Sequence, residues 1–141
     1  MSALDVSVQA QVLNLLADLK KAFNLTYLFI SHDLAVVEAV CDQVAVIYFG
    51  SIVEVGPAEQ IFSRPGHPYT ELLSNSAPVV GRGLKVADNS GVELPDPLNP
   101  PTGCAFAGRC SRATEACGHT EPALTQLENK HLVCCHHPLK Y

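Results

Sequence analysis

Five cysteines lie close together in the last part of this chain of 141 residues, and thiols in such a group can ligate metal. Structural zinc sites usually begin with two cysteines about two to four residues apart, which this group lacks. Iron–sulfur clusters accept wider gaps, since each iron takes a thiolate from a different direction. Two other interpretations stay open. In one, zinc is held by two or three of the cysteines plus His119, His136 or His137; in the other, the thiols bind no metal. The cysteines are Cys104, Cys110, Cys117, Cys134 and Cys135.

A second candidate for chemistry is His32, which directly follows an apolar, β-branched stretch at residues 26–30. That stretch predicts a strand covered on both faces. In open α/β sheets the ligand-binding residues lie just beyond the carboxyl ends of strands, where an imidazole can donate a hydrogen bond to a phosphate. The alternative is a helix start, with Ser31 as the N-cap and Asp33 in the first turn. Asp5 is likewise a candidate N-cap.

The elements around these residues alternate between helix and strand. Apolar residues at spacings of three and four predict a helix from Asp5 to about Phe23, which Asn24 can close. The order indicates the late part of an α/β domain with a parallel sheet. The remaining predictions are a strand at 26–30, a helix at 34–40, a hairpin of strands 43–48 and 52–55, and short helices near 58–62 and 68–73.

Composition divides the chain into three regions. Residues 1–76 are rich in Val, Leu and Ile, residues 77–102 form a linker rich in proline and glycine, and residues 103–141 hold the cysteine group. A net charge of −5 and the lack of a basic cluster argue against a nucleic-acid partner. There is no secretory signal pattern and no apolar run of the roughly 20 residues that a membrane span needs. We therefore expect the thiols to meet a reducing cytosol.

The order of several motifs resembles ABC ATPases. SALD, then a helix, LFISHD and VAVIYFGSIVEVG stand at spacings similar to those of the D-loop, the switch-histidine loop and the closing hairpin. The resemblance implies that His32 contacts the γ-phosphate and the attacking water. It also implies that Asp5 reaches the opposite nucleotide site across a dimer. The fold class implied is α/β: the C-terminal part of a P-loop NTPase domain, followed by a small Cys-rich extension.

Later motifs narrow the resemblance. GPAEQIFSRPGHPYTELL and GCAFAGRC…VCCHHP are similar to the oligopeptide/dipeptide (and nickel) importer subfamily. Some members hold a [4Fe–4S] cluster in this module. The resemblance implies Cys104, Cys110, Cys117 and Cys135 as ligands, with Cys134 as an alternative ligand and zinc as an alternative metal. His67 and Tyr69, in the HPY motif, are expected to fix a turn and pack the last helix.

Motifs that grip ATP do not occur in these residues. There is no Gly-rich P-loop and no LSGGQ-like signature, and the family's strand ending in Asp-Glu would precede Ser2. We therefore expect a C-terminal fragment that neither binds ATP tightly nor hydrolyses it alone. ATP and magnesium are cofactors of the full-length family.

The function implied is that of part of an ATP-binding subunit that powers peptide uptake, with nickel as the other substrate of the subfamily. The implied partners are a second ATPase subunit and transmembrane permease subunits, on the inner face of the cell membrane. Two alternatives stay open. Residues 103–141 could act as a stand-alone metal-binding or regulatory module, or the chain could be a truncated remnant without function.

Overall fold

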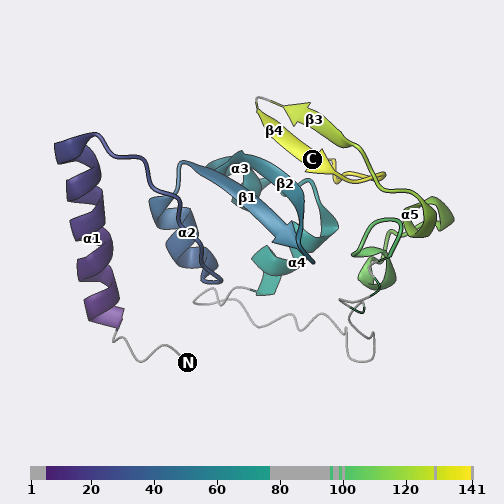
Figure 1. Cartoon of the computed structure of the whole chain (residues 1–141), viewed down its shortest axis with the longest axis horizontal. Helices are drawn as coiled ribbons and strands as arrows, with labels where there is room; N and C mark the ends of the chain where they lie inside the picture. The colour runs from purple at the N-terminus through teal and green to yellow at the C-terminus, as the bar shows by residue number, and fades with distance from the viewer. Residues whose placement is uncertain (1–5, 77–95, 97–98, 100, 129, 141) are drawn as a thin grey trace. The chain divides into compact units, whose positions relative to one another are not determined.

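The computed structural model describes residues 6–76, 96, 99, 101–128 and 130–140 (Figure 1). The chain divides into two compact units, Met1–Cys41 and Asp42–Tyr141. None of the helices in the described part of the chain has the length and apolar character needed to cross a bilayer.

Within its described residues, 6–41, the first unit contains two helices, both at predicted positions. Helix α1 spans Val6–Phe23. It ends where Asn24 takes up left-handed backbone with φ 51°, a conformation that asparagine tolerates at helix ends. Helix α2 spans Leu34–Val40, and its N-cap is Asp33, whose carboxylate accepts from two backbone N–H groups of the first turn. Ser31, expected as the cap, instead accepts a hydrogen bond from the N–H of Asp33 at 3.0 Å.

The strand expected at residues 26–30 does not form. These residues lack regular secondary structure, and Leu28 and Ile30 are 92% and 89% exposed. A strand is held by ladder hydrogen bonds to a neighbour, and no described strand pairs with this stretch. Its apolar, β-branched composition therefore does not by itself produce a strand here.

The described residues of the second unit form a four-stranded antiparallel sheet, not the parallel sheet that the sequence predicted. Its order is β1-β2-β4-β3. The predicted first hairpin is confirmed, and its turn has positive φ at Phe49 and Gly50, as tight hairpin turns require. The strands are β1 Gln43–Tyr48, β2 Ser51–Pro57, β3 Leu124–Glu128 and β4 His131–Cys134.

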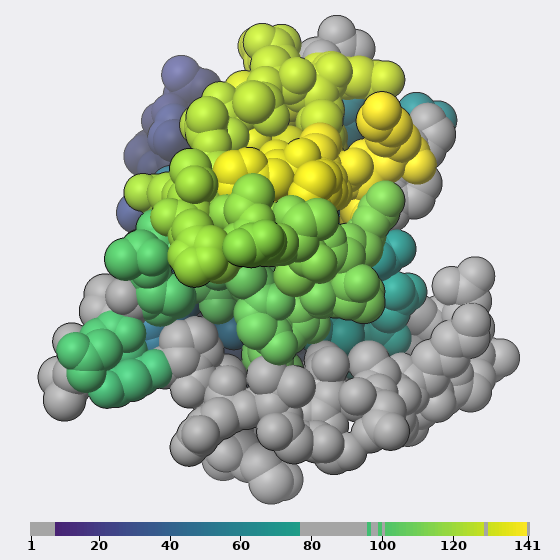
Figure 2. Space-filling view, turned by 90° about the vertical axis from the view of Figure 1, so that its right-hand side faces the viewer, coloured from purple at the N-terminus to yellow at the C-terminus, as the bar shows by residue number. Residues whose placement is uncertain are grey.

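Strand β4 joins segments far apart in the sequence. It pairs with β2 through Glu54 opposite Val133 and Val55 opposite Leu132. On the face shown in Figure 2, the green residues from 101 onward adjoin the yellow C-terminal segment. The Cys-rich region thus shares a sheet with the first hairpin. The helices of this unit are α3 Ala58–Ser63, α4 Pro68–Ser76, α5 Glu115–His119 and the short 3-10 helix η1 Ala107–Arg109.

An aromatic cluster forms the core between the hairpin and the Cys-rich region. Phe106, only 3% exposed, packs edge-on against Tyr48 with ring centroids 5.3 Å apart. The ring centroid of Tyr69 lies 4.5 Å from that of Tyr48 and 5.4 Å from that of Phe106. Val53 of β2 completes the buried centre. Because Phe106 lies between Cys104 and Cys110, its burial fixes the loop that carries both thiols.

Candidate functional site

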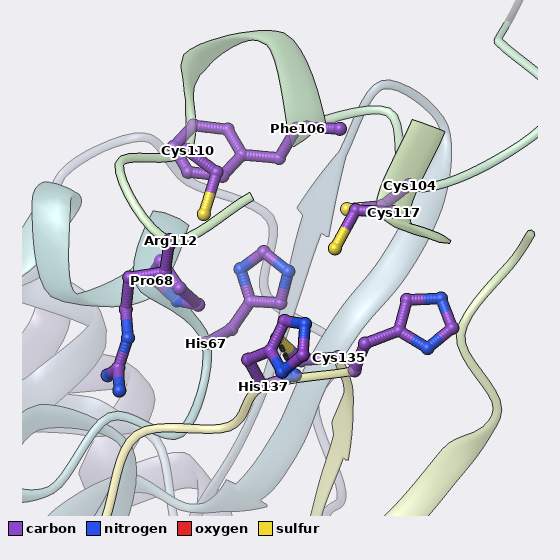
Figure 3. A pocket seen from close by; sticks show the side chains of 11 residues that line it. His67, Pro68, Cys104, Phe106, Cys110, Arg112, Cys117, Cys135 and His137 are labelled. Carbon is purple, nitrogen blue, oxygen red and sulfur yellow. Dashed lines mark hydrogen bonds between the residues drawn. The ribbon is translucent and has the colours of Figure 1, made fainter. Parts of the chain in front are cut away.

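Four of the five clustered cysteines line one small cavity in the second unit, of about 20 Å³ (Figure 3). They come from separate segments: the loop around η1, helix α5 and the residue after β4. These are Cys104, Cys110, Cys117 and Cys135, and the other polar residues of the lining are His67, Arg112, His136 and His137.

Backbone hydrogen bonds fold the two thiol loops together. The N–H of Cys104 donates to the carbonyl of Cys117 at 2.8 Å. The turn of η1 then carries the chain from Cys104 to Cys110. Gly103 makes this approach possible, because a Cβ there would collide with the Cys117 carbonyl and with the backbone of Gly118.

Backbone N–H groups approach three of the four sulfurs. The N–H of Thr114 donates to Cys117 Sγ at 3.5 Å, and that of His137 donates to Cys135 Sγ at 3.4 Å. Near Cys104, backbone N–H groups of its loop also favour the thiolate. Donors aimed at sulfur stabilise its charged form, the form that binds metal.

Burial works against those donors in the metal-free chain. It raises the pKa of Cys104, where neighbouring Cys117 and Cys110 raise it further. It also raises the pKa of Cys135, again with a contribution from the other thiols. Metal binding must therefore displace protons from neutral thiols.

The fifth cysteine of the group, Cys134, is placed differently. Its thiol donates to the carbonyl of Pro122 at 2.8 Å, and it is not among the residues that line the cavity. Burial, followed by the charges of Glu121 and Cys104, raises its pKa. The fold thus turns Cys135, and not its neighbour, toward the other three thiols. Cys41, expected in a core, is half-buried in the other unit.

The histidines named as zinc candidates are already engaged or remote. His136 Nε2 donates to the carbonyl of Thr120 at 2.9 Å, and His137 Nε2 lies 2.9 Å from Thr114 Oγ1. His119 does not line the cavity. Among the described residues, no three His, Cys, Asp or Glu side chains are placed to hold one metal ion together.

His67 is a cavity residue whose position the sequence did not indicate. It is 1% exposed, and its Nδ1 accepts from the N–H of Tyr69 at 3.0 Å, which confirms the expected turn. Its Nε2 is buried and has no hydrogen-bond partner in the described part of the chain. Burial lowers the pKa of His67 to about 4, although the charge of Glu54 opposes the shift.

A buried carboxylate, Glu54, joins the segments around this site. It is 0% exposed and accepts from the backbone N–H of Gly66 and of His67. His131 Nε2 of β4 lies 2.6 Å from its Oε1. The sequence offered one signal of this arrangement: a charged residue amid the apolar residues of a predicted strand.

Of the residues expected to act on ATP, His32 is not among those that line this cavity. His32 is exposed at a bend just before α2, in the first unit. Asp5 lies outside the described residues. The roles of both stay predictions.

Comparison with known proteins finds similarity to ATP-binding proteins of peptide transporters. A family model described as oligopeptide/dipeptide transporter, C-terminal region, matches residues 53–117. The dipeptide transport ATP-binding protein of Haemophilus influenzae is 50% identical over 137 residues, which are 96% of this chain and 42% of that protein. The di/tripeptide transport ATP-binding protein of Pseudomonas aeruginosa is 49% identical over 137 residues, which are 96% of this chain and 42% of that protein.

A putative peptide import ATP-binding protein of Brucella ovis is 47% identical over 135 residues, covering 95% of this chain and 43% of that protein. The chain therefore spans less than half the length of each of these relatives.

Proposed function

Because this chain is similar to ATP-binding proteins of peptide transporters, we propose that it belongs to the family of ATP-binding subunits of oligopeptide/dipeptide ABC transporters and supplies the C-terminal part of such a subunit. The observation that carries the proposal is the similarity itself. It extends over 96% of the chain at 50% identity, through both the segment of His32 and the cysteine group. In this role the chain helps to drive uptake of peptides.

His32 is proposed as the switch histidine that contacts the γ-phosphate and the attacking water. An exposed position at the start of a helix suits it, because the ring is free to meet a nucleotide held by other segments. Asp5 is proposed as the D-loop residue that reaches the second nucleotide site. ATP and magnesium are the cofactors of this reaction, and the P-loop that grips them is not among the 141 residues.

The partners proposed are a second ATP-binding subunit and the transmembrane permease subunits. The family resemblance supports both, and it also supports a position on the cytoplasmic face of the cell membrane. The first unit carries apolar side chains that suit burial by such neighbours. Val12, Leu15 and Phe23 of α1 are 44%, 57% and 68% exposed.

The cysteine cavity is proposed to hold a [4Fe–4S] cluster. In a tetrahedral zinc site, sulfurs about 2.3 Å from one ion crowd together, and no described group of three ligands does so here. A cluster instead takes one thiolate for each iron, which suits four thiols spread around a cavity. Backbone donors near Cys104, Cys117 and Cys135 also suit charged sulfur.

The cavity is smaller than a cluster. We therefore expect the loop around η1, whose Cys104 and Cys110 are only half-buried, to move outward on binding. When bound, the cluster would supply redox-active iron and cross-link three segments of the second unit. The protein's own contribution is the four thiols: Cys104, Cys110, Cys117 and Cys135.

One observation favours a second candidate function. The unit Asp42–Tyr141 has its own sheet and its own aromatic core. The stand-alone metal-binding or regulatory module was expected in residues 103–141, and the pairing of β2 with β4 extends the proposed module to this whole unit.

A chimera separates the two functions. This chain replaces the matching segment of the Haemophilus influenzae relative, and ATP hydrolysis and dipeptide uptake are measured. We expect both activities in the chimera. We expect His32→Ala to lower hydrolysis at least about 100-fold, because charge stabilisation at the phosphate is lost. His119→Ala is the control, since His119 is exposed and away from the cavity.

The 141-residue chain alone should hydrolyse no ATP. Hydrolysis by the isolated chain would contradict the proposed dependence on a P-loop. A folded chimera that binds ATP but is inactive before any substitution would favour the stand-alone module.

A further inference from the structure

The imidazole of His67 stands among the four thiols of the cavity, although it comes from a different part of the chain (Figure 3). It belongs to the loop just before α4, and it is nearly inaccessible to solvent. Phe106 packs near the ring, with centroids 5.8 Å apart. The backbone N–H of His67 donates to the carboxylate of Glu54 at 2.9 Å. The hydrogen bond to Glu54 thus fixes the backbone of His67, and the packing of Phe106 fixes its ring.

The hydrogen bond from Tyr69 decides which ring nitrogen carries the proton. The N–H of Tyr69 can only donate, and it points at His67 Nδ1 from 3.0 Å. Nδ1 must then offer its lone pair. In the neutral imidazole the proton consequently resides on Nε2, which makes Nε2 a donor.

This Nε2–H donor has no acceptor among the described residues, and it is buried. A buried donor without a partner costs about 1–3 kcal/mol, so such groups are rare unless a ligand completes them. The rings of His136 and His137 are engaged with Thr120 and Thr114. Among the side chains that line the cavity, the sulfur atoms of four cysteines can accept a hydrogen bond.

We propose that His67 is a positioning residue for the group bound by the cysteines, and that its Nε2–H donates a hydrogen bond to a sulfur of that group. The acceptor is either a cysteine thiolate or an inorganic sulfide. The inference rests on the proposed cluster. It adds a fifth protein contact that is not a ligand, supplied by the segment that Glu54 ties to β2.

Such a bond has two measurable consequences. Hydrogen bonds to sulfur stabilise the more negative, reduced state, so they raise the reduction potential of an iron–sulfur cluster. Outer-shell partners also hold ligands in place, and their loss typically weakens metal binding by about 10-fold to 100-fold.

Two substitutions separate the proposed donor from the structural bond to Tyr69. His67→Gln places an amide N–H₂ near the position of Nε2 but gives up the ring nitrogen that accepts from Tyr69. His67→Asn keeps a side-chain oxygen near the position of Nδ1 but does not reach the cavity. The 141-residue chain is purified without oxygen in each form. Iron and sulfide content, the rate of iron loss to a chelator and the midpoint potential are then measured.

We expect His67→Asn to lose iron about 10-fold to 100-fold faster and to shift the midpoint potential to a more negative value. His67→Gln should stay close to the original chain in both. The reverse order, with His67→Asn unchanged and His67→Gln impaired, would show that only the bond to Tyr69 matters and would overturn the inference.

The result for the unsubstituted chain separates the two proposals. If it holds iron and sulfide while both variants behave identically to it, the cluster stands and the role of His67 is refuted. If the unsubstituted chain folds but takes up neither iron nor sulfide, the cluster proposal fails. The proposed hydrogen bond from His67 to the cluster then fails with it.

Discussion

Glu54 Oε1 lies 2.6 Å from His131 Nε2, and both residues are buried although 77 positions separate them. The same carboxylate accepts from the backbone of Gly66 and His67. One side chain therefore joins β2, the turn before α4 and β4. A buried carboxylate is tolerated only when its hydrogen bonds are satisfied, as they are here.

Replacing this carboxylate should destabilise the second unit. Glu54→Gln keeps the shape but turns an N–H₂ group toward groups that are themselves donors. We expect a loss of about 3 kcal/mol in the free energy of unfolding, measured by urea denaturation. Glu59→Gln is the control, because Glu59 is exposed on α3, and it should change stability by less than about 0.5 kcal/mol. Equal stability of the two variants would show that Glu54 is not essential to the fold.

Two glycines in the Cys-rich region should respond in opposite ways to alanine. A Cβ at Gly103 would overlap the Cys117 carbonyl, whereas nothing lies within 4 Å of one at Gly108. Gly103→Ala should cost about 1–3 kcal/mol and lower the iron retained, because the loops carrying Cys104 and Cys117 must separate. Gly108→Ala should change stability by less than about 1 kcal/mol. Denaturation curves and iron analysis of both variants test this. Tolerance of Gly103→Ala would mean that the close approach is dispensable.

The adjacent cysteines provide a matched pair for the metal site. Cys135 lines the cavity, while Cys134 donates to Pro122. Cys135→Ser should bind iron at least about tenfold more weakly, because loss of an outer-shell partner alone weakens metal binding by about that factor. Cys134→Ser should retain its iron. The measurement is iron and sulfide per chain after anaerobic purification. Iron loss in Cys134→Ser alone would assign the fourth ligand to Cys134.

His67 predicts a pH dependence of stability in the metal-free chain. Burial lowers its folded pKa to about 4, so the unfolded chain, with the ordinary value near 6.5, binds the proton more readily. The contribution is present above about pH 6.5 and is lost as the pH falls toward about 4. Between about pH 7 and pH 5, the loss of this contribution lowers the free energy of unfolding by about 2 kcal/mol.

His67→Gln removes this titration and serves as the comparison, since other groups titrate in the same range. The original chain should lose about 2 kcal/mol more than His67→Gln on acidification. Arg112 and the cavity thiols line the same cavity as the ring, and Glu54 accepts from the backbone N–H of His67. All of these groups are the same in both proteins. Parallel losses in the two proteins would show that His67 is not buried in its neutral form.

Local patterns predicted the elements whose structure depends on nearby residues. Helix α1 follows from its apolar spacing, and the first hairpin follows from two short apolar runs around Gly50. Residues 26–30 had the composition of a strand, but a strand also requires a neighbouring backbone. Strands β3 and β4 were not predicted, because they are short and are held by pairing with β2 and with each other.

The site shows the same division. The family resemblance implied Cys135 as a ligand and Cys134 as the alternative, and the fold places Cys135 with the other three thiols. That these thiols bind metal stays a prediction. The contribution of His67 was not visible, because the fold brings the turn before α4 to loops nearly 40 residues later. Its motif indicated only a local turn, which the bond to Tyr69 confirms.

The pairing of β2 with β4 has a consequence for how the chain tolerates cleavage. The sheet contains segments from both sides of residues 77–95, and Glu54 with His131 adds a buried link between them. Its integrity therefore does not require an unbroken backbone between those segments. Residues 42–76 and 101–140 should behave as complementing halves that reassemble when supplied separately. Each half alone would present an unpaired strand edge, so neither should remain soluble without the other.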